Sequence, residues 1–147
     1  MTREVSTALV LEAKQEKGIS YQEIADTIGR DIVWTTSALL GQNTLDAVEA
    51  DKVCKLLGLN KEVERALQVF PSKGVTAVMP PTDPLIYRLY EIVLIYGDTI
   101  KQVIHEKVGD GIMSAIDFSM HIEKVENSKG DRVRITLDGK FLPYKKW

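Results

Sequence analysis

The sequence is poor in the features that mark secreted and membrane-spanning proteins. Its 147 residues include one cysteine, Cys54, so no disulfide can form within the chain and no cysteine metal cluster can be built from it. No apolar run approaches the roughly 20 residues that a membrane-spanning helix needs. The N-terminal stretch also lacks the apolar segment of a signal peptide. We therefore expect a cytoplasmic protein without a membrane partner.

An excess of positive charge is absent as well. The formal net charge is −2 at pH 7, whereas nucleic-acid-binding proteins usually carry a basic surface. His105 and His121 each lack a second ligand-type residue at metal spacing. The composition therefore argues against a nucleic-acid partner and predicts no metal site, while an apolar share of 44% is that of an ordinary globular protein.

The first half of the chain predicts a compact bundle of short helices. The signals are apolar residues at helical spacing, capping residues at the starts and glycines at the ends. Ser20 and Glu23, for example, form the sequence pattern of a capping box. Five helices are expected. The first ends at Gly18, the second and third span residues 20–28 and 31–40, the fourth runs from about Thr44 to Leu57, and the fifth runs from Asn60 to Val69.

One part of this half, Ser20–Gln42, resembles the helix-turn-helix of repressor-like domains. DNA binding is one interpretation of that resemblance. However, Ile32–Leu40, the segment that would enter the major groove, contains no lysine or arginine. Residues 1–70 carry 8 basic and 11 acidic side chains, a net charge of −3, which disfavours binding to phosphates. A bundle that only reuses this helix packing is the favoured interpretation.

Proline marks a boundary near the middle of the chain. Phe70–Asp83 contains three of the five prolines, together with Gly74, which is typical of an extended linker. The sequence therefore predicts two domains, a helical one over residues 1–75 and a second one over residues 76–147.

The second domain begins with an unusually apolar helix, Leu85–Tyr96. Only Arg88 and Glu91 interrupt its aliphatic and aromatic residues, so no face is meant for water and burial is expected. Asp83 and Pro84 suit its start and Gly97 its end. A separate amphipathic helix is expected to begin after Asp98.

Arg88 and Glu91 are out of place in this helix. A spacing of three residues lets the two side chains meet. Charges placed among isoleucines must be paired, bound to a ligand or shifted in pKa, because breaking a buried pair costs roughly 3–5 kcal/mol. The pair is therefore a candidate functional site.

From Ile112 the apolar period changes from helical spacing to two, which predicts a half-buried strand. A turn at Asn127–Asp131 leads to a second alternating segment, so a β-hairpin is expected. Ser114 interrupts the apolar face of the first strand. Its hydroxyl either bonds to nearby backbone, a common arrangement, or serves a function.

A single hairpin and an entirely apolar helix cannot cover each other in about 70 residues. The sequence therefore predicts an obligate oligomer of α+β class, in which hairpins of two chains form an intertwined dimer and helices pack at the interface. Arg88 and Glu91 of neighbouring chains would then gather in a dry, charged pocket.

Two segments carry a resemblance to a known family, PTDPLIYRLYEIVLIYGDTIKQVIHEKVGDGIMSAIDF and the ending ITLDGKFLPYKKW. They resemble the cyanase family, the cyanate hydratases or lyases, and the first half, including ALLGQ, follows the family pattern too. The resemblance implies conversion of cyanate and bicarbonate to ammonia and carbon dioxide through carbamate. It implies no metal or organic cofactor, bicarbonate as a second substrate, and a decamer of five dimers.

The resemblance also implies site residues. The family's catalytic arginine, glutamate and serine match Arg88, Glu91 and Ser114, and substrate binding would fall to Arg88, Ser114 and the amide of Ala115. The role of Glu91 stays open between orienting Arg88 and carrying a proton. Bacterial members often have a cysteine in the loop before this motif; Ser72–Asp83 has none, and we take that cysteine to be dispensable.

Two other functions compete with this enzyme. One is a helix-turn-helix transcription regulator with a C-terminal dimerisation domain, which predicts duplex binding that weakens steeply with salt. The other is a purely structural oligomerisation module, in which apolar replacement of Arg88 and Glu91 would be neutral or stabilising.

Overall fold

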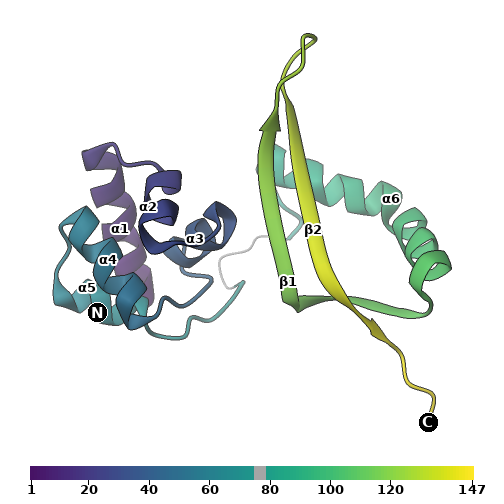
Figure 1. Cartoon of the computed structure of the whole chain (residues 1–147), viewed down its shortest axis with the longest axis horizontal. Coiled ribbons are helices and arrows are strands. Elements are labelled where there is room, and N and C mark those ends of the chain that lie inside the picture. Colours follow the sequence, from purple (N-terminus) through teal and green to yellow (C-terminus); the bar gives the residue numbers. More distant parts are fainter. Residues whose placement is uncertain (75–78) are drawn as a thin grey trace. The chain divides into compact units, whose positions relative to one another are not determined.

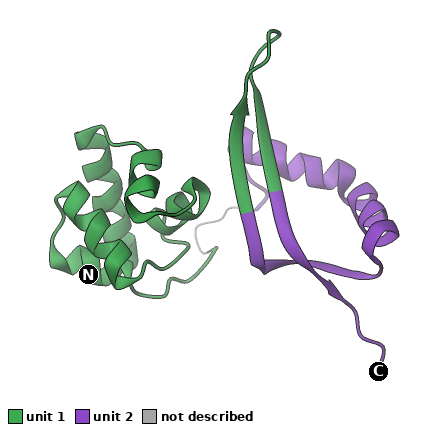
Figure 2. Cartoon of the chain, viewed as in Figure 1, with its two compact units in different colours: residues 1–75, 120–136 green, residues 76–119, 137–147 purple. Residues whose placement is uncertain are grey.

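The computed structural model describes residues 1–74 and 79–147. The chain divides into two compact units, one made of residues 1–75 and 120–136 and the other of residues 76–119 and 137–147 (Figure 2). The predicted linker, Phe70–Asp83, includes residues 75–78, which lie outside the described residues.

Five short helices form a bundle in the first unit, as the sequence predicts (Figure 1). Its core is made of aliphatic side chains such as Ile24, Leu39 and Leu57, which have almost no contact with solvent. Ala25, which is fully buried, lies in the helix-turn-helix-like pair formed by the second and third helices. The helices are α1 (Arg3–Lys17), α2 (Tyr21–Ile28), α3 (Ile32–Leu39), α4 (Ala47–Leu57) and α5 (Lys61–Leu67).

Local capping contacts fix where these helices begin. The Ser20 hydroxyl accepts from the Glu23 amide at 3.1 Å, and the Ser20 amide donates to the Glu23 carboxylate at 2.7 Å, so the predicted capping box is confirmed. The start predicted for the fourth helix is wrong. α4 begins at Ala47 rather than at Thr44, because Asp46 forms a second capping box with Glu49.

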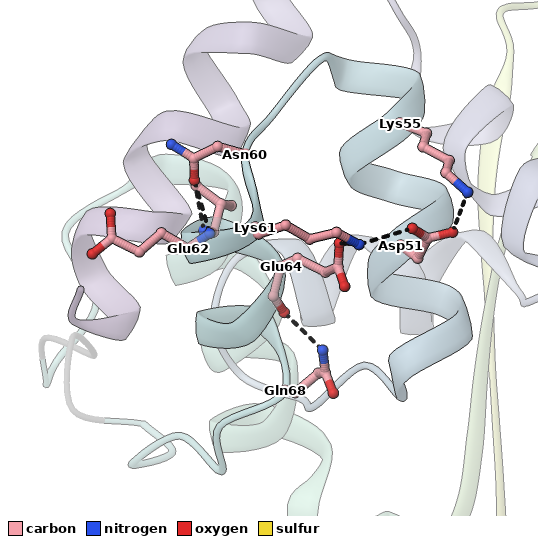
Figure 3. A network of polar contacts seen from close by, with 8 residues as sticks. Asp51, Lys55, Asn60, Lys61, Glu62, Glu64 and Gln68 are labelled. Carbon is pink, nitrogen blue, oxygen red and sulfur yellow. Dashed lines mark hydrogen bonds and ion pairs between the residues drawn. The ribbon is translucent and has the colours of Figure 1, made fainter.

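A surface network of charges joins α4 to α5 (Figure 3). The Lys61 ammonium lies 2.6 Å from a carboxylate oxygen of Glu64 and 3.4 Å from one of Asp51, which also pairs with Lys55 at 2.7 Å. The two lysines are largely exposed, so each pair contributes little, about 0–1 kcal/mol. The bundle therefore depends on its apolar core and caps.

Replacement of Glu49 by alanine should lower the free energy of unfolding by about 1–3 kcal/mol. The Glu49 side chain is only 7% exposed, pairs with Arg30 Nε at 2.6 Å and accepts from the Asp46 amide at 2.9 Å. Thermal unfolding of the full-length protein measures the change. Glu62→Ala is the matched control, because that side chain is 64% exposed and its ion pair, with the N-terminal ammonium, is long at 3.7 Å. Equal losses in the two variants would contradict the prediction.

The apolar segment forms the start of one long helix, α6 (Pro84–Val108). Asp83 caps it as predicted, since its carboxylate accepts from the amides of Leu85 and Ile86 at 2.9 and 3.0 Å. The prediction that Gly97 ends the helix and that Asp98 begins another is wrong. Glycine inside a helix costs only about 1 kcal/mol, and a methyl group at Gly97 would meet nothing closer than Val93 Cγ1 at 3.9 Å.

None of the residues of α6 is buried within the single chain. Val93, Leu94 and Ile95 are about 60% exposed, at 60%, 61% and 62%. The expected burial is therefore not provided by the chain itself. An apolar surface of this extent on one helix is typical of an interface. Among the described residues, every helix is too short or too polar to span a membrane.

The strands β1 (Gly111–Val125) and β2 (Arg132–Pro143) form the predicted hairpin (Figure 1). The prediction that β1 is half-buried is wrong for the single chain: Ile116, on the expected inner face, is 98% exposed. The cause is the same as for α6, namely that no second layer formed by residues 1–74 and 79–147 covers this apolar face. The helical bundle and the hairpin confirm the predicted α+β class.

Candidate active site

Arg88 and Glu91 lie one turn apart near the start of α6. Their side chains meet as predicted, with Arg88 Nη1 at 2.8 Å from Glu91 Oε2. The ion pair brings the two opposite charges together on one face of the helix. Glu91 lies at Nη1, and the opposite Nε–Nη2 edge of Arg88 has no hydrogen-bond partner among the described residues. That edge has the fork geometry that binds a planar anion through two oxygens.

Solvent reaches the Arg88–Glu91 pair in the single chain. The Arg88 side chain is 71% exposed and that of Glu91 34%. An ion pair this exposed contributes about 0–1 kcal/mol to stability. The pair therefore has little value for folding the isolated chain, and the dry pocket expected around it requires other chains.

Ser114 is one of the few buried polar residues, with 7% exposure. Its Oγ accepts hydrogen bonds from the amides of Ile116 and Asp117 at 3.0 and 2.9 Å. This turn breaks the strict alternation of β1 and matches the account in which the hydroxyl bonds to nearby backbone. Since the two amides occupy both lone pairs, Ser114 has only its O–H proton left to offer, as a hydrogen-bond donor.

A hydroxyl that already accepts two hydrogen bonds is a stronger donor, because the bonds polarise one another. Such a group suits an anionic ligand. Gly139, which sequence reasoning did not single out, lies across the hairpin from Ser114 and approaches the Ser114 carbonyl closely. The signal that could have indicated it is a glycine inside a strand.

The single chain does not bring all the predicted residues together. Arg88 and Glu91 are in contact, but in the described part of the chain no hydrogen bond or ion pair joins either of them to Ser114. Ala115, the last predicted substrate-binding residue, is exposed next to Ser114 on β1.

Within residues 1–74 and 79–147, no cluster of three or more histidine, cysteine, aspartate or glutamate side chains is placed to hold a metal ion. The cysteine, Cys54, lies in α4 and belongs to the core of the bundle. Burial, assisted by the charge of Glu64, raises the pKa of its thiol to about 11. The thiol is therefore protonated at neutral pH, and its nucleophilic thiolate is present in quantity only near or above that pKa.

Cys54→Ala should leave turnover unchanged, because the thiol is remote in sequence from the candidate site and unreactive at neutral pH. Alkylation with iodoacetamide at pH 7.5 should likewise be slow in the folded protein and fast after unfolding. Mass spectrometry of the intact chain follows the alkylation. Rapid loss of activity on alkylation of the native protein would mean that Cys54 does serve the site.

A five-helix bundle is joined to a long helix and a β-hairpin, which is an α+β architecture. The helix and the hairpin carry an Arg–Glu pair and a buried serine donor, polar groups that are suited to binding small anions. Two family models then match successive parts of the chain. Residues 3–71 match the "Cyanate hydratase, N-terminal" family and residues 78–146 the "Cyanate lyase C-terminal domain" family. The chain belongs to the cyanate hydratase family.

Curated relatives agree over the full length. "Cyanate hydratase" of Synechococcus sp. (strain CC9311) is 53% identical over 96% of this chain and 94% of its own length. The enzyme of the same name from Thiobacillus denitrificans is 52% identical over 99% of both chains. The solved structure "Crystal structure of cyanase from T. urticae" is 41% identical, with a TM-score of 0.84, and the match covers 94% of this chain and 96% of that one. These matches give no support to the DNA-binding alternative.

Proposed function

We propose that this protein is a cyanate hydratase that decomposes cyanate with bicarbonate as its second substrate, giving ammonia and carbon dioxide through carbamate. The observation that carries the proposal is the full-length similarity to proteins named cyanate hydratase, at about half of all positions, such as 52% over 147 residues for the one from Albidiferax ferrireducens. The Arg–Glu pair and the donor-only serine supply the chemistry that two small anions require.

The division of labour in the chain follows from the same comparison. We propose a helical domain over residues 1–75 and a catalytic and oligomerisation domain over residues 76–147. The family models, which meet between residues 71 and 78, support this boundary. The uncovered apolar surfaces of α6 and β1 support assembly into a homo-oligomer, for which we propose five dimers forming a decamer.

Arg88 is the proposed anchor for bicarbonate. Both substrates are monoanions, so a site that brings them together needs fixed positive charge and oriented donors in a place with little water. The Nε–Nη2 edge of Arg88 can donate two parallel hydrogen bonds to two oxygens of bicarbonate. The ion pair with Glu91, at 2.8 Å, orients that edge, and we assign Glu91 this orienting role.

Ser114 is the proposed donor to cyanate and to the planar adduct. Its hydroxyl proton is the hydrogen-bonding capacity that the Ile116 and Asp117 amides leave unused. The amide of Ala115, next to it, is proposed as a second donor. Donors fixed in advance stabilise developing negative charge without reorganising during the reaction.

The reaction then proceeds by bond changes within the two substrates. A bicarbonate oxygen forms a bond to the cyanate carbon, and an electron pair of the carbon–nitrogen bond moves to nitrogen, which takes up protons from bicarbonate and solvent. The bond between that oxygen and the bicarbonate carbon breaks, releasing carbon dioxide and leaving carbamate. Protonation of the carbamate nitrogen and cleavage of its carbon–nitrogen bond release ammonia and a second carbon dioxide.

These steps need no electron acceptor or donor outside the substrates, and we propose that the enzyme works without an organic or metal cofactor, in the cytoplasm. Carbon labelling tests the reaction directly. With ¹³C-cyanate and unlabelled bicarbonate, mass spectrometry of the first turnovers should show labelled and unlabelled carbon dioxide in equal amounts for each ammonia formed. Labelled carbon dioxide with no unlabelled carbon dioxide above that of an enzyme-free sample would mean simple hydrolysis of cyanate and would refute the role of bicarbonate.

A further inference from the structure

The strand opposite Ser114 contains a glycine that the packing requires. A Cβ atom added at Gly139, on β2, would collide with the Ser114 carbonyl oxygen, and it would lie 2.5 Å from Met113 Cγ and 3.2 Å from Met113 Sδ. Real Cβ atoms essentially never come within 3.0 Å of such neighbours. Gly139 is not among the glycines with positive φ, so space rather than backbone conformation excludes a side chain there.

The collision would fall on the part of β1 that shapes the serine turn. The Ser114 carbonyl belongs to the same residue whose Oγ accepts from the Ile116 and Asp117 amides. A flexible side chain such as that of Met113 can move aside, but a backbone carbonyl within a paired strand cannot do so without moving its residue. The position of the Ser114 hydroxyl therefore depends on the bare backbone of Gly139.

We propose that Gly139 is a positioning residue that acts through Ser114. It lets β2 pass close against Ser114 and so fixes the direction in which the remaining O–H proton points. The proposal deepens the proposed function, on which it rests, because that proton is the donor assigned to cyanate. A methyl group at residue 139 displaces the carbonyl, turns the Ser114–Asp117 turn and misdirects the donor.

A double-mutant cycle distinguishes this role from a general weakening of the hairpin. Gly139→Ala in the full-length protein should lower kcat/KM for cyanate by about 10–100-fold, since a misplacement of about 1 Å can cost that much. In the Ser114→Ala background the same substitution should cause no further loss, because the group that it misdirects is gone. Losses that multiply in the double variant would overturn the proposal.

Met113 provides the matched control, because its side chain is the other group that the new methyl would meet. In the Met113→Ala/Gly139→Ala variant the side-chain collision is relieved while the carbonyl collision remains, so the loss relative to Met113→Ala alone should persist. Full recovery would assign the effect to Met113 and overturn the proposal. If Gly139→Ala alone does not assemble, kcat/KM is compared between Met113→Ala and Met113→Ala/Gly139→Ala instead.

Hydrogen exchange gives a readout that needs no activity. In Gly139→Ala the amides of Ile116 and Asp117 should exchange faster than in the unmodified protein, whereas the helices of the bundle should keep their rates, as measured by mass spectrometry of peptides. Unchanged exchange at these two amides would overturn the positioning role even if cyanate proved not to be the substrate. Failure of the unmodified protein to decompose cyanate would instead refute the proposed function alone.

Discussion

Replacement of Arg88 by alanine is expected to lower kcat/KM for cyanate by about 10²–10³-fold or more, which is the usual effect of removing one preorganised donor to a developing anion. The loss has two causes. Arg88 supplies the positive charge that holds two monoanions together, and its Nε–Nη2 edge supplies paired donors in a fixed plane. Steady-state ammonia release over a range of cyanate and bicarbonate concentrations measures the effect, and KM for bicarbonate should rise most.

Arg88→Lys separates charge from geometry. Lysine keeps the positive charge but presents it as a point without the planar fork, so this variant should recover only part of the lost activity. Arg134→Ala is the matched control, because Arg134 forms a comparable exposed pair with Glu123, at 2.9 Å, on the hairpin. Full activity of Arg88→Ala, or an equal loss in Arg134→Ala, would remove Arg88 from the site.

Replacement of both Arg88 and Glu91 distinguishes the enzyme from a purely structural oligomerisation module. In both accounts, Arg88→Leu with Glu91→Leu is expected to be neutral or stabilising, as apolar replacement of buried ion pairs often is. Only the enzyme account predicts that this stable double variant is inactive. Retained turnover in a stable assembly would favour the structural module.

Insertion of a charge into the apolar face of α6 is the second substitution with a large expected effect. Val93→Asp should dissociate the assembly and abolish turnover, because an unpaired carboxylate buried between chains costs several kcal/mol at each copy of the interface. Val93 is 60% exposed in the single chain and lies about 140° around the helix axis from Arg88 at about 100° per residue. The substitution therefore leaves the ion pair itself untouched.

Light scattering and circular dichroism on the same samples measure this effect. The variant should have a lower mass while the helical signal of the bundle persists, since the core of α1–α5 is complete within one chain. Gln102→Asp, at an exposed polar position of the same helix, is the control and should stay assembled. A folded, active monomer would contradict the expectation that the site is completed by other chains.

The sequence predicted those parts of the fold that local contacts determine. The capping box of Ser20 and Glu23 joins residues three positions apart, so its pattern is visible without the structure. The same pattern is present at Asp46 and Glu49, and it marks the start of α4 at Ala47, three residues after the predicted start at Thr44. At Gly97 the sequence predicted a helix end where α6 continues, because a glycine permits the end of a helix but does not require it.

Long-range contacts account for what could not be predicted. The Arg3 guanidinium is buried in the bundle, where it donates to the carbonyls of Ala38 and Asn43 at 2.7 and 2.9 Å, and burial lowers its pKa. No pattern near residue 3 indicates these partners. At the candidate site, Arg88, Glu91 and Ser114 stand out in the sequence as charges and a hydroxyl among apolar neighbours. The two hydrogen bonds that Ser114 accepts and the close approach of Gly139 depend on how the hairpin folds, and no local pattern indicates them.

The central claim is that this chain decomposes cyanate with bicarbonate as a reactant. Ammonia release by the purified oligomer in buffer freed of carbon dioxide, before and after addition of bicarbonate, tests it most directly. The account predicts negligible release without bicarbonate, saturable release with it, and loss of that release in Arg88→Ala. Release at the same rate with and without bicarbonate, or no release from a well-folded oligomer, would contradict it.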